Sequence, residues 1–321
     1  MLNRRHVLVA SILTVLPEAR AATGTFQAFV TGVKAEARKA GVSDATLERA
    51  FAGVAPNQKV LDRDRHQPEF TMTWARYKTL VVNDQRIASG REIFKRERAL
   101  FRQVEDRLAV GPSAIAGIWG LESGFGVTTG DFHVIEALST LAWDGRRAAF
   151  FRSELMAALK ILERGDIAPN KMMGSYAGAM GQPQFMPSSY LRFAIDFEGH
   201  GKRDIWTSRP DVLGSIGNYL AKSGWRAGES WGQQVILPPG FDMATAGRDA
   251  MRPLSEWVRQ GVRPTEASWR GQAGAQAAVV APDGAGGEAF VAYANFKAIR
   301  RYNPSDFYAI AVGIVGDRVV A

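Results

Sequence analysis

The sequence predicts an α+β fold in which helices predominate. Apolar residues recur at helical spacing through most of the chain up to residue 222, as they do in 26–37. From Trp231 to Phe296 the pattern changes to short apolar runs between glycine- and proline-rich turns, which is typical of short strands. The run Asp306–Val315 is again apolar and helical. We therefore expect a helical protein with a small β-rich insert.

The composition is that of a globular protein. The 321 residues are 46% hydrophobic and 10% aromatic, enough for one large domain or two to three smaller ones. The absence of cysteine excludes disulfides, a thiolate metal site, a cysteine nucleophile and a cysteine-linked lipid anchor. A net charge of +8 favours an anionic partner, but no nucleic-acid-binding motif accompanies it. We therefore expect neither a lipid anchor nor a nucleic-acid partner.

The first 21 residues have the pattern of a secretory signal peptide. A basic start at Asn3–His6 precedes the apolar run Val7–Leu16, and Ala19–Ala21 offers small residues for cleavage. The Arg4–Arg5 pair leaves both the general and the twin-arginine export routes open. A buried N-terminal helix is the alternative interpretation. We expect export to the periplasm.

The remaining chain divides into four segments by its changes of pattern. They are a helical N-terminal region, a helical core, a small β-rich domain and an apolar C-terminal segment. Their predicted bounds are 22–110, 111–228, 229–298 and 299–321.

One carboxylate interrupts the apolar helix predicted from Pro112 onward. Glu122 follows Ile118 by four residues and Ile115 by seven, so it shares their inward face. Apolar surroundings and the C-terminal end of a helix both raise the pKa of a carboxyl group. We therefore expect Glu122 to act as a general acid. A buried structural glutamate that pairs with an arginine is the alternative.

The segment Gly174–Phe193 combines glycines and prolines with aromatic and amide side chains. Glycine permits close approach of the backbone, while Ser175, Gln182, Gln184 and Ser188 supply neutral hydrogen-bonding groups suited to sugar hydroxyls. The segment therefore indicates a saccharide groove. The alternative is a connecting loop with a purely structural role.

The segment Asp196–Thr207 resembles a degenerate calcium loop. The EF-hand pattern needs carboxylates at positions 1, 3 and 5, glycine at 6 and a bidentate glutamate at 12. Asp196, Glu198 and Gly201 fit positions 1, 3 and 6, but His200 stands at 5 and Thr207 at 12. We expect a metal-free turn rather than a calcium site, and hence no cofactor.

Three longer motifs indicate a family. They are IWGLESGFG at Ile118–Gly126, AGAMGQPQFMPSSY at Ala177–Tyr190 and RYNPSDFYAIAV at Arg301–Val312. With these motifs the chain resembles the lytic murein transglycosylases of the B type, glycoside hydrolase family 103, from QPEF at Gln67–Phe70 onward. The resemblance implies a lysozyme-like helical core with an N-terminal helical arm and a small β domain.

The resemblance also implies roles for individual residues. Glu122 stands where the family has its single catalytic acid/base, and Ser175 and Gln184 match residues of the saccharide groove. Arg146 and Arg147 match paired arginines near the peptide-bearing part of the substrate, while Phe150 replaces a tyrosine of some members. Residues around the cleavage site are matched by Tyr219, Tyr302, Asn303 and Tyr308.

The implied reaction cleaves the bond between N-acetylmuramic acid and N-acetylglucosamine in peptidoglycan without water and leaves 1,6-anhydromuramic ends. Glycosidases normally use two carboxylates, so a hydrolytic muramidase remains an alternative if Asp131 or Glu136 lies opposite Glu122. A non-catalytic peptidoglycan-binding or scaffold protein is the second alternative. We expect a monomer whose partners are glycan strands and, in addition, proteins of cell-wall synthesis or remodelling.

Overall fold

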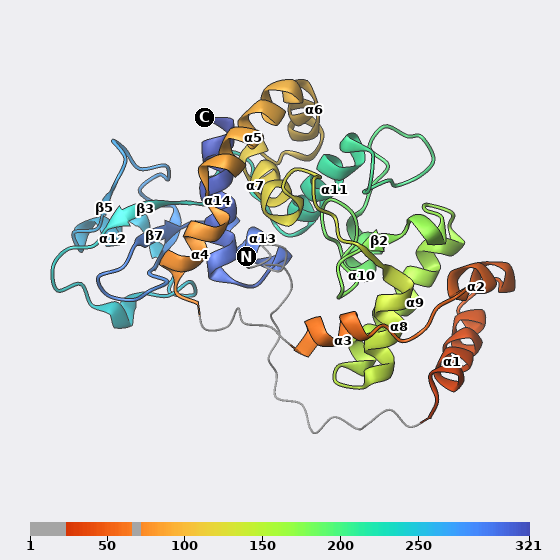
Figure 1. Cartoon of the computed structure of the whole chain (residues 1–321). Coiled ribbons are helices and arrows are strands. Elements are labelled where there is room, and N and C mark those ends of the chain that lie inside the picture. Colours follow the sequence, from red (N-terminus) through yellow and green to blue (C-terminus); the bar gives the residue numbers. More distant parts are fainter. Residues whose placement is uncertain (1–23, 66–71) are drawn as a thin grey trace. The chain divides into compact units, whose positions relative to one another are not determined.

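The computed structural model describes residues 24–65 and 72–321 (Figure 1). The predicted signal peptide at 1–21 and the QPEF motif at Gln67–Phe70 lie outside the described residues. The described chain forms two compact units. The helical unit contains 24–65 and 122–216, and the mixed unit contains 72–121 and 217–321.

The helical unit consists of helices with one short pair of strands. Helix α8 packs along α9, and α9 also contacts α10 and α2. The strands β1 and β2 pair antiparallel, with Phe132 opposite Gly174. The elements are α1 (Phe26–Lys39), α2 (Asp44–Phe51), α3 (Gln58–Arg65), β1 (Phe132–His133), α8 (Val134–Asp144), α9 (Ala148–Glu163), η2 (Pro169–Lys171), β2 (Met173–Gly174) and α10 (Pro187–Phe193).

Polar side chains fix the helix ends of this unit. The Ser43 hydroxyl accepts a hydrogen bond from the Thr46 backbone N–H and so caps α2. Glu163 on α9 in turn accepts from the Ser43 backbone N–H at 3.0 Å and from its hydroxyl at 2.8 Å. Glu154, buried on the same helix, accepts from the backbone N–H and hydroxyl of Ser188 in α10. Carboxylates of α9 therefore hold the first turns of two other helices.

The mixed unit combines helices with an antiparallel sheet in the order β4-β6-β7-β3-β5. Its elements are α4 (Trp74–Val81), α5 (Asp84–Arg96), α6 (Arg98–Leu108), β3 (Gly232–Ile236), η3 (Met243–Thr245), β4 (Arg252–Pro253), α12 (Leu254–Arg259), β5 (Arg263–Pro264), β6 (Gln276–Val280), β7 (Ala289–Ala292), α13 (Ala294–Tyr302) and α14 (Asp306–Val320). The helices α7 (Pro112–Ser123) and α11 (Arg209–Lys222) each begin in one unit and end in the other.

The predicted fold class is confirmed, and the β-rich insert lies where the sequence placed it. The apolar runs at Ala277–Ala281 and Phe290–Tyr293 form β6 and β7, which pair with each other. Helix α12 was not predicted, because in a six-residue helix the helical spacing of Leu254, Trp257 and Val258 extends over less than two turns. Helix α9 begins at Ala148, and Arg147 is its N-cap.

Glycines bring helix α7 into close contact with α14. A Cβ atom at Gly117 would lie 2.1 Å from the Val312 carbonyl oxygen, and one at Gly316 would lie 2.0 Å from that of Ser113. Both distances are far below van der Waals contact, so each position admits only glycine at this helix separation. The two backbones therefore touch at both ends of the contact.

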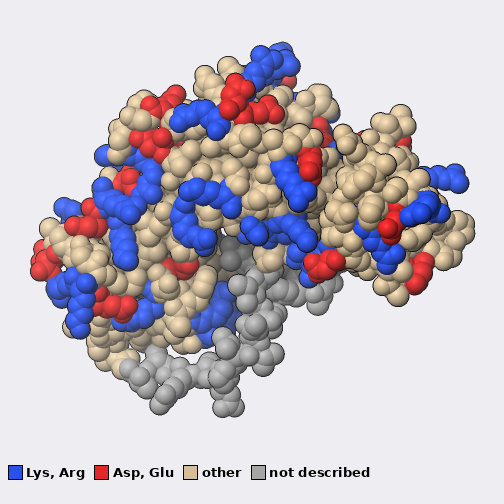
Figure 2. Space-filling view, turned by 180° about the vertical axis from the view of Figure 1, so that it is seen from behind, with Lys and Arg blue, Asp and Glu red and all other residues tan. Residues whose placement is uncertain are grey.

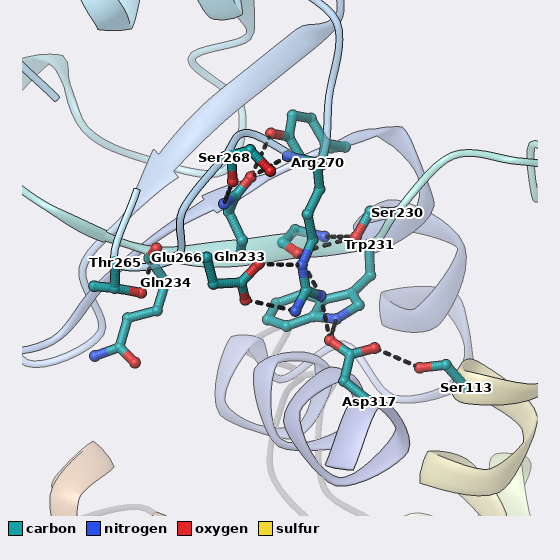
Figure 3. A network of polar contacts seen from close by, with 12 residues as sticks. Ser113, Ser230, Trp231, Gln233, Gln234, Thr265, Glu266, Ser268, Arg270 and Asp317 are labelled. Carbon is teal, nitrogen blue, oxygen red and sulfur yellow. Dashed lines mark hydrogen bonds and ion pairs between the residues drawn. The ribbon is translucent and has the colours of Figure 1, made fainter. Parts of the chain in front are cut away.

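A polar network centred on Asp317 ties the sheet region to these two helices (Figure 3). The Asp317 carboxylate on α14 accepts from the Ser113 hydroxyl at 2.6 Å and from Trp231 Nε1 at 2.9 Å, and it pairs with the Arg270 guanidinium. Arg270 also forms a bidentate pair with Glu266, at 2.6 and 3.0 Å. Because Ser113 belongs to the first turn of α7, this network holds the start of that helix.

We predict that Gly117→Ala destabilises the protein by about 1–3 kcal/mol, the cost of overpacking a close backbone contact. Gly32→Ala is the matched control, because Gly32 is also helical but has open space around it. Alanine has the higher helix propensity, so the control should gain about 0.5–1 kcal/mol. Denaturant unfolding measures both values. Equal effects of the two substitutions would show that the α7–α14 contact is not tight.

We also predict that Glu288 makes stability fall at acidic pH. Burial acts to raise its pKa, but hydrogen bonds from Lys78 at 2.6 Å and Trp74 at 2.7 Å outweigh it and hold the pKa below the ordinary 4.5. The unfolded chain therefore binds this proton first, and the Glu288 contribution, complete above pH 4.5, is lost as the pH falls through its folded pKa. Urea unfolding between neutral and acidic pH should show a shallower loss in Glu288→Gln, and identical slopes would contradict the prediction.

Candidate functional site

Glu122 lies at the end of α7 and is only 7% exposed. The chain after it is tightly turned, because the Ser123 hydroxyl accepts from the Gly126 backbone N–H at 3.0 Å. The Ser123 carbonyl also accepts from the Thr128 backbone N–H at 2.9 Å. Phe125 adopts a positive φ of 61°, which is rare for a residue with a side chain. The predicted burial of Glu122 at a helix end is confirmed.

The turn that follows Glu122 packs against the predicted saccharide segment. A Cβ atom at Gly126 would lie 2.5 Å from Gln182 Oε1, and one at Gly130 would lie 2.0 Å from the Gly174 carbonyl oxygen. Gln184 Nε2 also donates to the Thr129 carbonyl at 3.0 Å. Three contacts therefore join 126–130 to 174–184 within the helical unit.

Ser175 and Gln184 take different parts in this arrangement. The Ser175 hydroxyl oxygen accepts from the backbone N–H groups of Ala177 and Ala179, at 3.3 and 3.1 Å, so its position is fixed. Its own proton remains available to donate. The Gln184 side-chain nitrogen donates to two carbonyl groups, of Thr129 and Gly181, and thereby ties the turn together. Ser175 is thus suited to contact a ligand, while the Gln184 nitrogen serves the structure.

Arg146 and Arg147 precede helix α9 and both pair with Asp64 of α3. Arg146 Nε lies 2.9 Å from Asp64 Oδ2, and Arg147 Nη2 lies 3.4 Å from Oδ1. Asp64 itself is 2% exposed, whereas the side chains of Arg146 and Arg147 are 47% and 38% exposed. The Arg147 guanidinium also lies over the Phe151 ring, 4.7 Å from its centroid. The sequence alone does not identify Asp64, because it is one of two aspartates in the run QKVLDRDR and neither belongs to a recognisable motif.

The other predicted site residues belong to the mixed unit. The Tyr219 ring contacts the Tyr302 ring at 4.6 Å between centroids, and the Tyr219 hydroxyl donates to the Arg301 carbonyl. Asn303 follows α13, and its side-chain oxygen accepts from the Ser305 backbone N–H at 3.0 Å. Tyr308 lies in α14 and is buried. The structure thus brings Tyr219, Tyr302 and Asn303 to neighbouring positions in that unit.

The three acidic residues that follow Glu122 in the sequence each have a contact of their own. Asp131 lies 3.9 Å from the Arg63 guanidinium, and Asp144 pairs with Arg65 at 2.8 Å. Glu136 accepts from the Asn57 side-chain amide at 3.3 Å. Asp144 and Glu136 therefore have close partners within the helical unit, whereas the Asp131 side chain is 64% exposed and its contact with Arg63 is long.

The oxygens of the degenerate calcium loop are directed at backbone N–H groups. Asp196 accepts from the backbone N–H of Gly199, His200 and Gly201, at 2.6–2.9 Å. Desolvation acts to raise the Asp196 pKa, but these hydrogen bonds hold it below its ordinary value. Thr207, at position 12, donates to Asp204 and supplies no bidentate carboxylate. This donor set does not fit an EF-hand calcium ion, and the described residues contain no group of three or more His, Cys, Asp or Glu placed to bind a metal.

Two further observations concern the charge of the surface and the hydropathy of the helices. On the face shown in Figure 2, Lys and Arg side chains are interspersed with Asp and Glu. Across 24–65 and 72–321, no helix has both the length and the apolar character that crossing a bilayer requires.

We predict that Gly130→Ala disrupts the packing of the turn after Glu122 and lowers activity together with thermal stability. Gly165→Ala is the matched control: both glycines have positive φ, 94° and 75°, but only at Gly130 would an added Cβ atom have backbone within 4 Å. Backbone strain therefore affects both variants, whereas displacement of Gly174 affects only the first. Melting temperature and release of soluble glycan fragments measure the effects, and equal losses in both variants would argue against the close approach.

Comparison with known proteins shows a family. The model of the Transglycosylase SLT domain matches residues 25–317. The chain is 32% identical over 253 residues to membrane-bound lytic murein transglycosylase B of Escherichia coli K12, covering 77% of this chain and 67% of that protein. It is also similar to SltB3 of Pseudomonas aeruginosa in complex with NAG-anhNAM-pentapeptide, with a TM-score of 0.89 and 41% identity over 93% of this chain and 80% of that one.

A third relative extends the comparison to calcium. The structure of E. coli Slt35 in complex with calcium matches with a TM-score of 0.75 and 29% identity, over 92% of both chains. The loop of the present chain lacks a fitting donor set, as described above. The family model nonetheless spans nearly all of the chain, and the resemblance inferred from the three motifs is confirmed: the chain belongs to the family of transglycosylases that share the SLT domain.

Proposed function

We propose that the protein cleaves the bond between N-acetylmuramic acid and N-acetylglucosamine in peptidoglycan and forms 1,6-anhydromuramic ends, with Glu122 as its single catalytic acid/base. The observation that carries this proposal is a buried Glu122 in a family of lytic transglycosylases, while the acids near it in the sequence are paired elsewhere. The SltB3 complex supports it further, because that relative holds an anhydro-sugar with a peptide.

The first step is proton transfer from Glu122. Protonated Glu122 donates to the glycosidic oxygen, so the C1–O bond breaks and the N-acetylglucosamine end leaves as an alcohol. The acetamide oxygen of the muramic residue stabilises the positive charge that develops at C1. The Ser175 hydroxyl, held by two backbone N–H groups, donates to the substrate and orients it.

The second step returns the proton to Glu122. Its carboxylate accepts the proton of the C6 hydroxyl, whose oxygen attacks C1 and closes the 1,6-anhydro ring. No water is consumed, and Glu122 is again protonated for the next cleavage. Glu122 is buried at the end of α7, which suits this role. Excluding water from the reacting carbon suppresses the competing hydrolysis.

Two observations disfavour the alternatives. A hydrolytic muramidase needs a second carboxylate that activates water, whereas the similar E. coli protein is a lytic murein transglycosylase. A scaffold protein has no use for a desolvated acid, because burying a carboxyl group costs free energy.

We further propose the setting in which the protein works. A signal peptide at 1–21 exports it to the periplasm, where peptidoglycan strands are its substrate. It acts as a monomer without a cofactor, calcium included, and the proteins of cell-wall synthesis or remodelling are its expected protein partners.

We predict that purified sacculi treated with the mature protein release muropeptides lighter by one water than the reducing forms. Glu122→Gln keeps the size of the side chain but removes its titrating proton, so the rate should fall by about two to four orders of magnitude. Mass spectrometry of released fragments measures both outcomes.

The control for this substitution is binding of the variant to sacculi, which should persist. Reducing fragments from the wild-type protein would indicate hydrolysis instead. Binding by the wild-type protein without any fragments would indicate a scaffold, and normal turnover by Glu122→Gln would exclude Glu122 as the catalytic acid.

A further inference from the structure

We propose that a cavity in the β-rich part of the mixed unit is a second saccharide-binding site, in which the Trp269 ring packs against an N-acetylated sugar of a glycan strand. The cavity has a volume of about 550 Å³ and lies between helix α12 and the segment 269–273; we call it the Trp269 cavity. That the sugar belongs to peptidoglycan rests on the proposed function, whereas the cavity and its polar groups are observed in the structure.

Both walls of the Trp269 cavity are fixed by backbone hydrogen bonds. Helix α12 contributes Leu254, Ser255, Val258 and Arg259. Their spacing of one, four and five residues places them on one side of the helix. The first two backbone N–H groups of α12 donate to the carbonyl groups of Ala275 and Ala273, both at 2.9 Å, so the opposite wall is tied to the helix. The volume lies in the range of about 300–1,000 Å³ that small-molecule sites occupy.

Trp269 is held in place by the side chain of Gln233 on β3, which is only 1% exposed (Figure 3). The Gln233 side-chain nitrogen donates to the Ser268 carbonyl at 3.1 Å, and its oxygen accepts from the Arg270 backbone N–H at 2.7 Å. These two bonds fix the backbone on both sides of Trp269. The indole packs against the hydrophobic cluster of the sheet but is only partly buried, and it lines the cavity. A rigid aromatic ring of this kind loses little conformational entropy on binding.

Three polar groups of the lining make no hydrogen bond or ion pair with the rest of the described chain. They are the indole N–H of Trp269, the hydroxyl group of Ser255 and the guanidinium group of Arg259. None of the described residues that line the cavity is acidic, so the charge of Arg259 is not offset there. The cavity therefore combines an aromatic face with free hydrogen-bond donors and one positive charge.

This combination fits a sugar ring better than an apolar partner. The C–H face of a pyranose is apolar and packs on an aromatic ring, while its hydroxyl and acetamide oxygens accept hydrogen bonds. Leu254 and Val258, the latter 43% exposed, suit the methyl group of an acetamide. Arg259 suits a carboxylate, which a peptide-bearing glycan strand carries. An apolar partner would leave the three polar groups without hydrogen bonds, at a cost in free energy.

The test follows the indole N–H signal of Trp269 by NMR in the mature Glu122→Gln protein, which does not consume the probes. The chain has eight tryptophans, so Trp269→Phe identifies the signal by its loss. The probes are NAG-NAM-pentapeptide, which is anionic, and a neutral oligomer of N-acetylglucosamine. Both should shift the Trp269 signal until it saturates. The shift reports the Kd of this cavity even when sugar also binds near Glu122.

Arg259→Gln should weaken binding of NAG-NAM-pentapeptide at least about fivefold and binding of the neutral oligomer less than about twofold, because only the first probe has carboxylates. Ser255→Ala should weaken both by about two- to tenfold, the effect of one lost hydrogen bond. Arg263→Gln is the matched control and should change neither Kd. Arg263 is also exposed and forms no ion pair with another described residue, but it does not line the cavity.

Three outcomes would overturn the inference. They are a Trp269 signal that neither probe shifts, equal effects of Arg259→Gln and Arg263→Gln, and a shift on concentrating the protein without sugar, which would show that a second copy covers the cavity. The proposed function is tested separately. If the wild-type protein releases no anhydro fragments while both probes shift the Trp269 signal, the proposed reaction fails and the binding site stands.

Discussion

The close contact between helices α7 and α14 is the constraint on which the placement of α7 depends. Two glycines, Gly117 and Gly316, allow the backbones to touch, and any Cβ atom at either position would overlap a carbonyl group. Asp317 adds a polar tie from α14 to the first turn of α7, and Arg270 connects it to the sheet region. Helix α7 ends at Ser123, so these contacts hold the helix on which Glu122 lies.

Close approach at glycines also fixes the chain beyond Glu122, where the partners are different. Gly126 and Gly130 bring the turn against Gln182 and Gly174, so that small residues again replace side-chain packing by backbone contact. The hydroxyl of Ser175 is held by two backbone N–H groups. Pre-organisation of this kind reduces the reorganisation needed when charge develops during bond cleavage.

Much of the fold, and the burial of Glu122 at a helix end, could be predicted from the sequence. Helical periodicity located α1 and α7, the glycine- and proline-rich stretch located the sheet, and one carboxylate in an apolar helix indicated Glu122. The contacts that hold these elements could not be predicted, because Gly117 in a helix says nothing of what lies opposite it. Asp64 and Asp317 likewise belong to no recognisable sequence motif, and only the fold brings them to their arginine partners.

In the proposed reaction, one carboxylate cleaves the glycan strand without water. Cleavage of sacculi in water enriched in heavy oxygen tests this directly, with mass spectrometry locating the label. We expect anhydro-ended fragments that carry no heavy oxygen at the muramic C1, because the C6 hydroxyl of the same sugar closes the ring. Fragments with one heavy oxygen at that carbon would contradict this expectation and would require a second group that activates water.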